Sequence, residues 1–143
     1  MDDDIPELLK SHFEDPYHRG DCERATCAAQ SHDSATGHFV AVQLRIIDRL
    51  VAEAWFDAAG CWQCEAPASI LIQFCEGKSI EELSHLDSEF LLTLTQLNRL
   101  KTASSCQSLA WIALQAALRS SEQEMDSADD QPLFGGPSLW EES

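Results

Sequence analysis

Residues 60–64 read Gly-Cys-Trp-Gln-Cys, and two cysteines at this spacing can serve three kinds of chemistry. They can supply half of a zinc site, form a redox-active dithiol, or be two small residues with unrelated roles. A thioredoxin-like dithiol needs further strands after the motif, whereas residues 66–120 predict only helices. A zinc ribbon needs a second CxxC or an HxxxH, and the sequence has neither. The motif alone therefore does not decide the function.

Cys61 and Cys106 share a more informative feature, which is their position at predicted helix starts. Cys61 comes just before a helix predicted at 66–77, and Cys106 falls in the first turn of a helix predicted at 104–120. The unpaired N–H groups and partial positive charge of a helix N-terminus favour thiolate over thiol. Thiolate is the form that binds metal or accepts sulfur, so the pair indicates one shared site. The alternative is that both are buried small residues.

An antiparallel hairpin is predicted to lead the chain into this motif. Residues 38–47 alternate apolar with smaller or polar side chains, which is typical of a strand. Asp48 and Arg49 can then turn the chain into a second strand at 50–58. Before the hairpin we expect a short helix at 4–13, capped by Asp4 with Pro6 in its first turn, and then an irregular arm at 14–37.

Everything after the motif is predicted to be helical, which makes the fold class α+β: a small antiparallel β-sheet packed against several α-helices. The helices are expected at residues 66–77, 79–86, 88–100 and 104–120. Cys75, inside the first of these, is expected to be a small core residue. Residues 1–120 form the predicted domain, and residues 121–143, with seven acids and no base, an acidic disordered tail.

Charge and composition narrow the classes of function. The chain has 143 residues, enough for one domain with its own core, and a net charge of −16. Because phosphate binding needs clustered Lys and Arg, we expect no nucleic-acid partner. No stretch approaches the apolar length of a membrane span, and the N-terminus lacks the basic region of a signal peptide. We therefore expect a cytoplasmic protein, without membrane association, whose six cysteines are reduced.

Three stretches of the sequence resemble one known family. They read HFEDPYHRG at 12–20, AWFDAAGCWQCEAPASILIQFCEGKSIEEL at 54–83, and CQSLAWIALQAAL at 106–118. Together they resemble the NifU/IscU family of iron–sulfur cluster assembly scaffolds, from roughly residue 12 to residue 119. The second stretch is similar to the family's strand, Gly-Cys turn, small-residue helix and Gly-Lys-Ser turn without a gap.

The resemblance implies a ligand set that this chain matches only in part. Family members hold a nascent [2Fe–2S] cluster with three cysteines and an aspartate two residues after the first. Cys61 matches the second cysteine and Cys106 the third. The ungapped alignment places Thr36 and His38 where the family has its first cysteine and its aspartate. Ser105 replaces a frequent basic residue.

A competing alignment makes Cys27 the first ligand, at the expense of an insertion before the strand. Under the ungapped alignment, Cys64 and His38 could complete the donor set instead. His38, Cys61, Cys64 and Cys106 would suit Zn²⁺ as well as an iron–sulfur cluster. The other interpretation of His38 is a solvated residue at a strand end. Trp62 is expected at the edge of the core.

The resemblance therefore predicts a divergent scaffold that binds iron or an iron–sulfur cluster through Cys61 and Cys106. It implies a cysteine desulfurase as sulfur donor and apo-proteins as cluster recipients, and it predicts no enzymatic turnover of a small substrate. Homodimerisation around a shared cluster stays open. Two alternatives remain: a zinc-binding adaptor or regulator of a cysteine desulfurase, and a sulfur acceptor that carries a persulfide on Cys61 alone.

Overall fold

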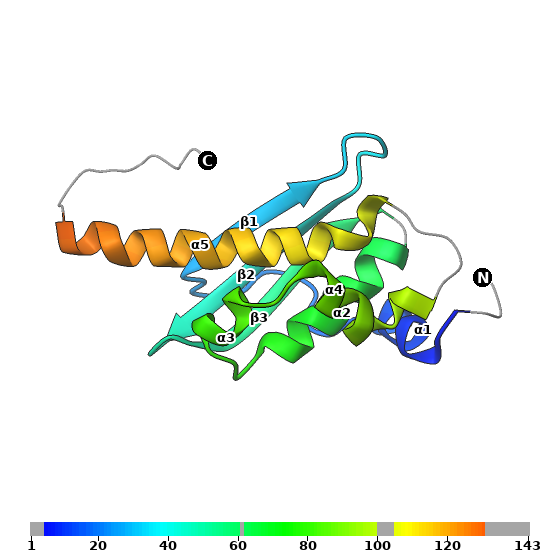
Figure 1. The fold of residues 1–143 in the computed structure, drawn as a ribbon, viewed down its shortest axis with the longest axis horizontal. Helices are drawn as coiled ribbons and strands as arrows, with labels where there is room; N and C mark the ends of the chain where they lie inside the picture. The colour runs from blue at the N-terminus through cyan, green and yellow to red at the C-terminus, as the bar shows by residue number, and fades with distance from the viewer. Residues whose placement is uncertain (1–4, 61, 100–104, 131–143) are drawn as a thin grey trace.

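The computed structural model describes residues 5–60, 62–99 and 105–130, and it confirms the predicted α+β class (Figure 1). A three-stranded sheet is followed by helices that pack on it. The elements in chain order are α1 (Glu7–Glu14), β1 (Cys27–His32), β2 (Phe39–Ile47), β3 (Leu50–Ala59), α2 (Trp62–Cys75), α3 (Ile80–Ser84), α4 (Ser88–Thr95), the 3₁₀ turns η1 (Leu97–Arg99) and η2 (Ser105–Ser108), and α5 (Leu109–Asp130).

The predicted hairpin is confirmed as β2 and β3. Its turn residues Asp48 and Arg49 have φ values of 55° and 64°. Two successive residues with positive φ give a tight turn whose twist matches that of the flanking strands. At the far end of the hairpin, Phe39 pairs with Ala59. The residues just outside that pair, at the start of β2 and the end of β3, are therefore neighbours in space.

Strand β1 lies inside the segment that the sequence analysis assigned to an irregular arm, and that part of the prediction is wrong. Cys27–His32 pairs antiparallel with β2, from Cys27 opposite Leu44 to His32 opposite Phe39. The sequence CAAQSH carries little of the branched or aromatic character that marks a strand. It becomes one because the edge of β2 offers a row of backbone groups that need partners.

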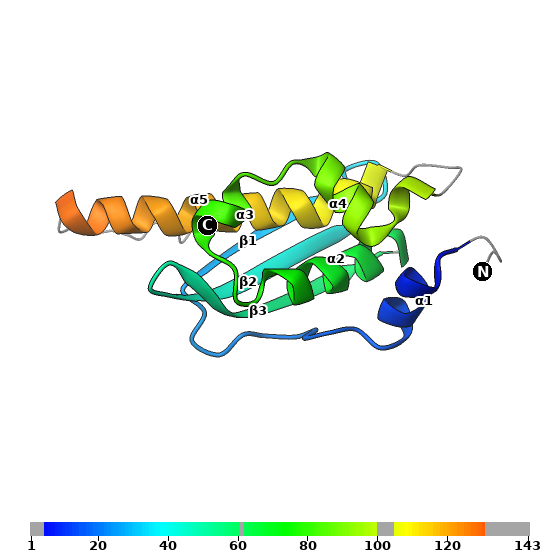
Figure 2. The same ribbon diagram turned by 60° about the horizontal axis from the view of Figure 1, so that its bottom comes forward.

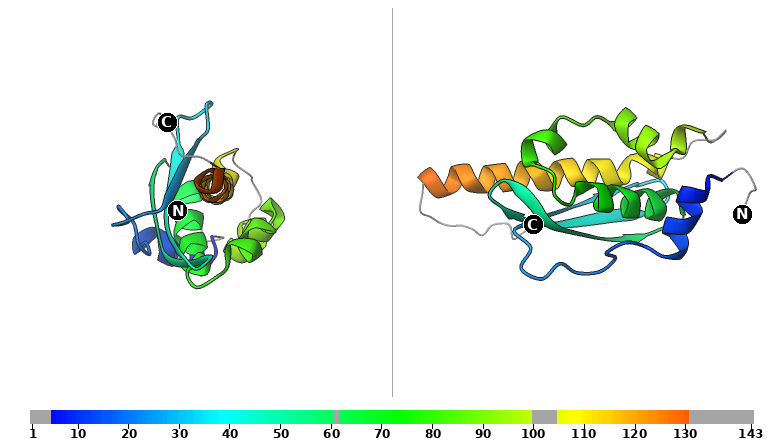
Figure 3. Two further views of the ribbon diagram at one scale, coloured as in Figure 1. Left: turned by 90° about the vertical axis from the view of Figure 1, so that its left-hand side faces the viewer. Right: turned by 90° about the horizontal axis from the view of Figure 1, so that it is seen from below.

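The core lies between one face of the sheet and the helices α2 and α5, as the end-on view in Figure 3 shows. Val40, Val42 and Leu44 alternate along β2 and are at most 1% exposed. From the helices, Leu71 and Leu114 are buried to the same extent. The alternating apolar residues of β2 thus form the sheet side of this core.

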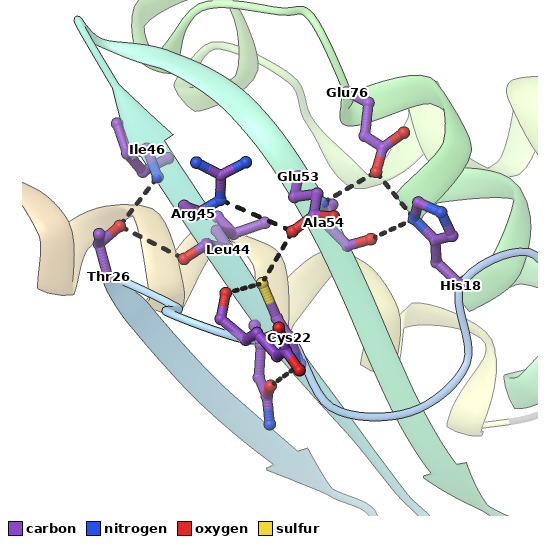
Figure 4. A network of polar contacts seen from close by, with 11 residues as sticks. His18, Cys22, Thr26, Leu44, Arg45, Ile46, Glu53, Ala54 and Glu76 are labelled. Carbon is purple, nitrogen blue, oxygen red and sulfur yellow. Dashed lines mark hydrogen bonds and ion pairs between the residues drawn. The ribbon is translucent and has the colours of Figure 1, made fainter.

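The segment between α1 and β1 covers the opposite side of the hairpin (Figure 2). It first runs along β3, where the N–H of Gly20 donates to the carbonyl of Phe56 at 2.8 Å. It then crosses to β2, and the N–H of Cys22 donates to Oε1 of Gln43 at 2.6 Å. Figure 4 shows the Cys22 side chain directed at the carboxylate of Glu53.

The starts of α1 and α2 differ from the predicted ones. Helix α2 begins at Trp62 rather than at residue 66, so Pro67 lies inside the helix and not near its start. Pro67 has no N–H to donate to the carbonyl of Gln63, but the preceding turn forms without it. Helix α1 begins at Glu7 with Pro6 at its N-cap and no side-chain cap there. The predicted cap, Asp4, lies outside the described residues.

Two helix ends also differ. Helix α4 ends at Thr95, five residues before the predicted end, because Gln96 adopts a left-handed conformation with a φ of 66°. Helix α5 continues to Asp130, so its last ten residues belong to the segment predicted as an acidic tail. Glu, Gln, Met and Ala in that stretch are good helix formers, which accounts for the extension. Residues 131–143 lie outside the described part.

None of the helices in the described ranges is long and apolar enough to cross a membrane.

Candidate functional site

The candidate site lies at the end of the sheet where β2 begins and β3 ends. Gly60 follows Ala59 there and has a φ of +154°. A Cβ at this position would lie 2.6 Å from Cγ of His38 and 2.8 Å from Sγ of Cys64. The structure therefore brings together two of the four predicted site residues, His38 and Cys64, against the same backbone atom. Only glycine leaves room for both side chains.

His38 is held at the end of the loop between β1 and β2. Its carbonyl accepts from the N–H of Asp33 at 2.9 Å, and its N–H donates to Oγ1 of Thr36 at 3.2 Å. The Thr36 hydroxyl donates in turn to Asp33 at 2.9 Å. The side chain of His38 is partly buried, and its Nδ1 atom is buried without a hydrogen-bond partner among the described residues. A solvated residue at a strand end does not have this environment.

The first turn of α2 carries the second half of the CxxC motif. Cys64 is 1% exposed. Trp62, the residue after Cys61, is partly buried, which agrees with its predicted place at the edge of the core. It packs against a small apolar cluster contributed by α1, α2 and η1, whose buried members are Ile5, Leu9, Ala66, Ile70 and Leu97.

The segment that carries Cys106 packs against the start of α2. In η2, Nε2 of Gln107 donates to Oε1 of Gln63 at 2.8 Å. Cys106 lies in this 3₁₀ turn. The sequence predicted it in the first turn of an α-helix, and that prediction is wrong. Such turns commonly tighten the entry to an α-helix, here the entry to α5 at Leu109.

The other two predicted donors are Cys61 and Cys106. Cys61 lies outside the described residues, and the side chain of Cys106 is likewise outside them. Their proximity to each other stays a prediction. Within the described ranges, no three or more side chains of His, Cys, Asp and Glu form a group able to hold a metal ion.

The register of the sheet argues against Cys27 as a ligand. Cys27 pairs with Leu44, whereas the site lies beyond the pair formed by Phe39 and Ala59. Five residues along β2 separate Leu44 from Phe39, or about 17 Å at strand rise. Thr36, by contrast, is hydrogen-bonded to the backbone of His38. This geometry favours the ungapped alignment.

Two further cysteines are held as thiols by their surroundings. Cys75 is fully buried, and burial raises the pKa of its thiol to about 12. It is the small core residue that the sequence predicts. Burial, together with the nearby carboxylate of Glu53, also raises the pKa of the Cys22 thiol. Both side chains therefore stay as thiols at neutral pH.

The charged side chains described next to the site are already paired. Arg19, from the segment before β1, lies 3.1 Å from the carboxylate of Glu65 in α2 and 3.4 Å from that of Asp57 in β3. These contacts tie three chain segments together at this end of the sheet. Among the described residues, the imidazole of His38 and the thiol of Cys64 lie beside Gly60.

The sequence analysis did not single out Gly60, Gln63 or Gln107 as site residues. For Gly60, a glycine directly before a cysteine at the end of a strand was the available signal. For the two glutamines, nothing in the sequence except their adjacency to Cys61, Cys64 and Cys106 pointed to a shared hydrogen bond.

Comparisons with known proteins give a family and similar solved structures. The family model for the NifU-like N terminal domain matches residues 7–127. A crystal structure of a nitrogen-fixing NifU-like protein (N-terminal) from Brucella abortus is similar, with a TM-score of 0.71 and 18% identity over 85% of this chain and 97% of that chain. A proposed iron–sulfur cluster assembly scaffold protein for the SUF system from Fervidobacterium islandicum AW-1 gives a TM-score of 0.62 and 15% identity, over 80% and 96% of the two chains. No curated protein matches the chain.

Proposed function

The chain belongs to the family of NifU-like N-terminal domains, and we propose that it is a scaffold on which iron–sulfur clusters are assembled. The cluster is cargo, built at the end of the sheet and passed on. Cys61 and Cys106 are its thiolate donors, and His38 and Cys64 complete the set. A cysteine desulfurase supplies the sulfur, and apo-proteins receive the cluster.

The environment of His38 is the observation that carries this proposal. A buried polar atom without a partner is rare in folded proteins and normally has a functional reason. The Nδ1 atom of His38 is such an atom, and the Cys64 thiol lies against the same glycine. Imidazole nitrogen and thiolate sulfur are the donors found in iron–sulfur centres that contain histidine. The family's aspartate is thus replaced by another group able to bind metal.

Anaerobic reconstitution with iron and sulfide, followed by visible absorption, tests the proposal. The parent protein should develop the charge-transfer bands of a cluster. Cys61→Ser and Cys106→Ser should each lose most of that absorption, and His38→Ala should shorten the lifetime of the cluster. Cys22→Ser is the matched control, because Cys22 is a buried thiol on the opposite side of the hairpin and should have no effect. Unchanged cluster yield in both site variants would refute the proposal.

The same protein preparation distinguishes the two alternatives. A zinc-binding adaptor would contain about one zinc per chain, bound through the mixed nitrogen and sulfur donors that suit this metal, and would form no cluster. A persulfide carrier would bind no metal but would gain one sulfur atom from a desulfurase. That gain would be lost in Cys61→Ser and retained in Cys106→Ser, as mass spectrometry would show.

A further inference from the structure

The contact between η2 and α2 involves two residues that no metal chemistry requires. Nε2 of Gln107 donates to Oε1 of Gln63 at 2.8 Å. In the sequence, Gln63 lies between Cys61 and Cys64, and Gln107 directly follows Cys106. The bond therefore joins the two backbone segments that carry the cysteines.

From this contact we infer that Gln63 and Gln107 are positioning residues for cluster assembly. Their hydrogen bond sets the spacing between the start of α2 and η2. The inference rests on the proposed function and deepens it, because it assigns roles to two residues that do not touch the cargo.

Because the bond is buried, it favours a single spacing between the start of α2 and η2. Gln107 is 8% exposed, so water cannot readily replace its partner. On its other side η2 continues into α5, where Leu109 and Ala110 are 3% and 2% exposed and belong to the main core. The 3₁₀ turn is thus anchored to the core by α5 and to the first turn of α2 by Gln107.

Cluster chemistry needs such control of spacing. Sulfur donors bind their metals at about 2.3 Å with little tolerance. Sites of this kind hold their geometry only when neighbouring side chains fix the segments that carry the ligands. An amide pair suits this role because it adds no charge and does not compete for the metal.

Carboxylate substitutions can separate the hydrogen bond from the identity of the side chains. In Gln63→Glu, the new carboxylate still accepts from Gln107. In Gln107→Glu, the amide of Gln63 can rotate and donate to the carboxylate. Each single variant therefore keeps one donor and one acceptor at unchanged length. The double variant sets two carboxylates against each other and loses the bond.

Two readouts test the inference on the full chain. The first is metal-free: a short reagent that alkylates two thiols should bridge Cys61 and Cys106, with the product identified by mass spectrometry. The second is cluster yield and lifetime after anaerobic reconstitution. Both single variants should cross-link like the parent in the metal-free assay, and the double variant should lose cross-linking and cluster at least several-fold while retaining a cooperative unfolding transition. Should the double variant fail to fold, Gln107→Ala replaces it.

The outcomes separate this inference from the proposed function. Cross-linking that is as fast in the double variant as in the parent overturns the positioning role, whatever the cluster yield. Single variants as defective as the double one overturn it too, because the hydrogen bond would then not be the cause. If cross-linking depends on the bond between Gln63 and Gln107 but the protein builds no cluster, the positioning role stands and the scaffold function is refuted.

Discussion

At the scale of single residues, Gly60 is the position that allows the site to form. Its φ of +154° is unfavourable for any residue with a side chain, and a Cβ added there would lie 2.6 Å from Cγ of His38 and 2.8 Å from Sγ of Cys64. The chain therefore needs glycine here for two reasons at once, backbone conformation and space. A side chain would push apart the two groups that the proposed function uses.

Gly60→Ala should destabilise the protein by about 3 kcal/mol or more, since backbone strain alone is worth about 1–3 kcal/mol. Gly37→Ala is the matched control, because Gly37 also has a positive φ, +79°, but no atom lies within 4 Å of its added Cβ. It should cost only about 1–2 kcal/mol. Urea unfolding of the two variants measures the difference. Equal losses would mean that the crowding at Gly60 is relieved without cost.

Thr36 tests the alignment of the first ligand. A threonine hydroxyl is a poor ligand beside thiolates, so Thr36→Cys should add a donor and increase the yield or lifetime of reconstituted cluster. Adding His38→Asp should bring the site closer to the family pattern. Cys27→Ser should leave the yield unchanged, because Cys27 pairs with Leu44 far along β2. The reverse result, with Cys27→Ser abolishing the cluster, would restore the gapped alignment.

At the scale of elements, hydrogen bonds to Ser69 connect α1 and the segment after it to α2. Ser69 is fully buried, and its hydroxyl oxygen accepts from the N–H of Tyr17 at 2.7 Å. When the imidazole of His12 carries its proton on Nε2, the hydroxyl donates its own proton to Nδ1, which lies 2.7 Å away. This arrangement requires an unprotonated Nδ1. Burial lowers the pKa of His12 accordingly, against a smaller opposing effect of Asp15.

This fastening should weaken in acid. The folded pKa of His12 is below the unfolded value near 6.5, so between these values the unfolded chain binds more protons. The free energy of unfolding must therefore fall as pH drops through about 6.5 and below. His12→Asn keeps an acceptor in the place of Nδ1 but cannot titrate. Urea unfolding at pH 7.5 and 5.5 should show a larger acid loss for the parent than for this variant, and parallel losses would contradict the prediction.

The elements also show which signals in the sequence were sufficient. The β2–β3 hairpin was predicted because its alternation and its turn are both local. The helix at 79–86 was predicted from local signals as well, and the hydroxyl of Ser79 caps α3 by accepting from the N–H of Glu82 at 3.0 Å. Strand β1 was missed because its pairing with β2, and not its own composition, makes it a strand.

Only those parts of the candidate site that a local motif or the family alignment marks could be predicted from the sequence. The alignment brought His38 into the donor set, and the motif brought in Cys64. Both side chains lie against Gly60 because of the register between β2 and β3. Hydrophobic alternation does not predict that register to within one residue. The bond between Gln63 and Gln107 joins segments that are 44 residues apart, and no local pattern encodes it.

At the scale of the whole molecule, the candidate site lies at one end of the sheet and the hairpin turn at the other. Strands β2 and β3 run between the two ends, and α2 starts at the site end, where β3 stops (Figure 1). Helix α5 spans the same core from η2 onward. The elements that bear the proposed ligands are thus packed into this core.

From the extent of α5 we expect the folded domain to continue past residue 120. The family match ends at residue 127 and the helix at Asp130, both beyond the boundary at 120 expected from composition. The buried stripe of α5 includes Ala117, Leu118 and Ser121, which are 0%, 1% and 6% exposed. A chain that stops at Ser120 would leave the last of these turns without its helical hydrogen bonds.

Truncation can locate the boundary. A chain of residues 1–130 should keep the melting temperature and the cluster yield of the full protein, because it retains every described element. A chain of residues 1–120 should be destabilised by about 1 kcal/mol, or roughly 4 °C, since the turn over Ala117 and Leu118 frays. Thermal unfolding followed by circular dichroism measures both. Equal melting temperatures for the two truncated chains would place the boundary at 120, whereas a loss on removing residues 131–143 would show that the acidic segment supports the domain.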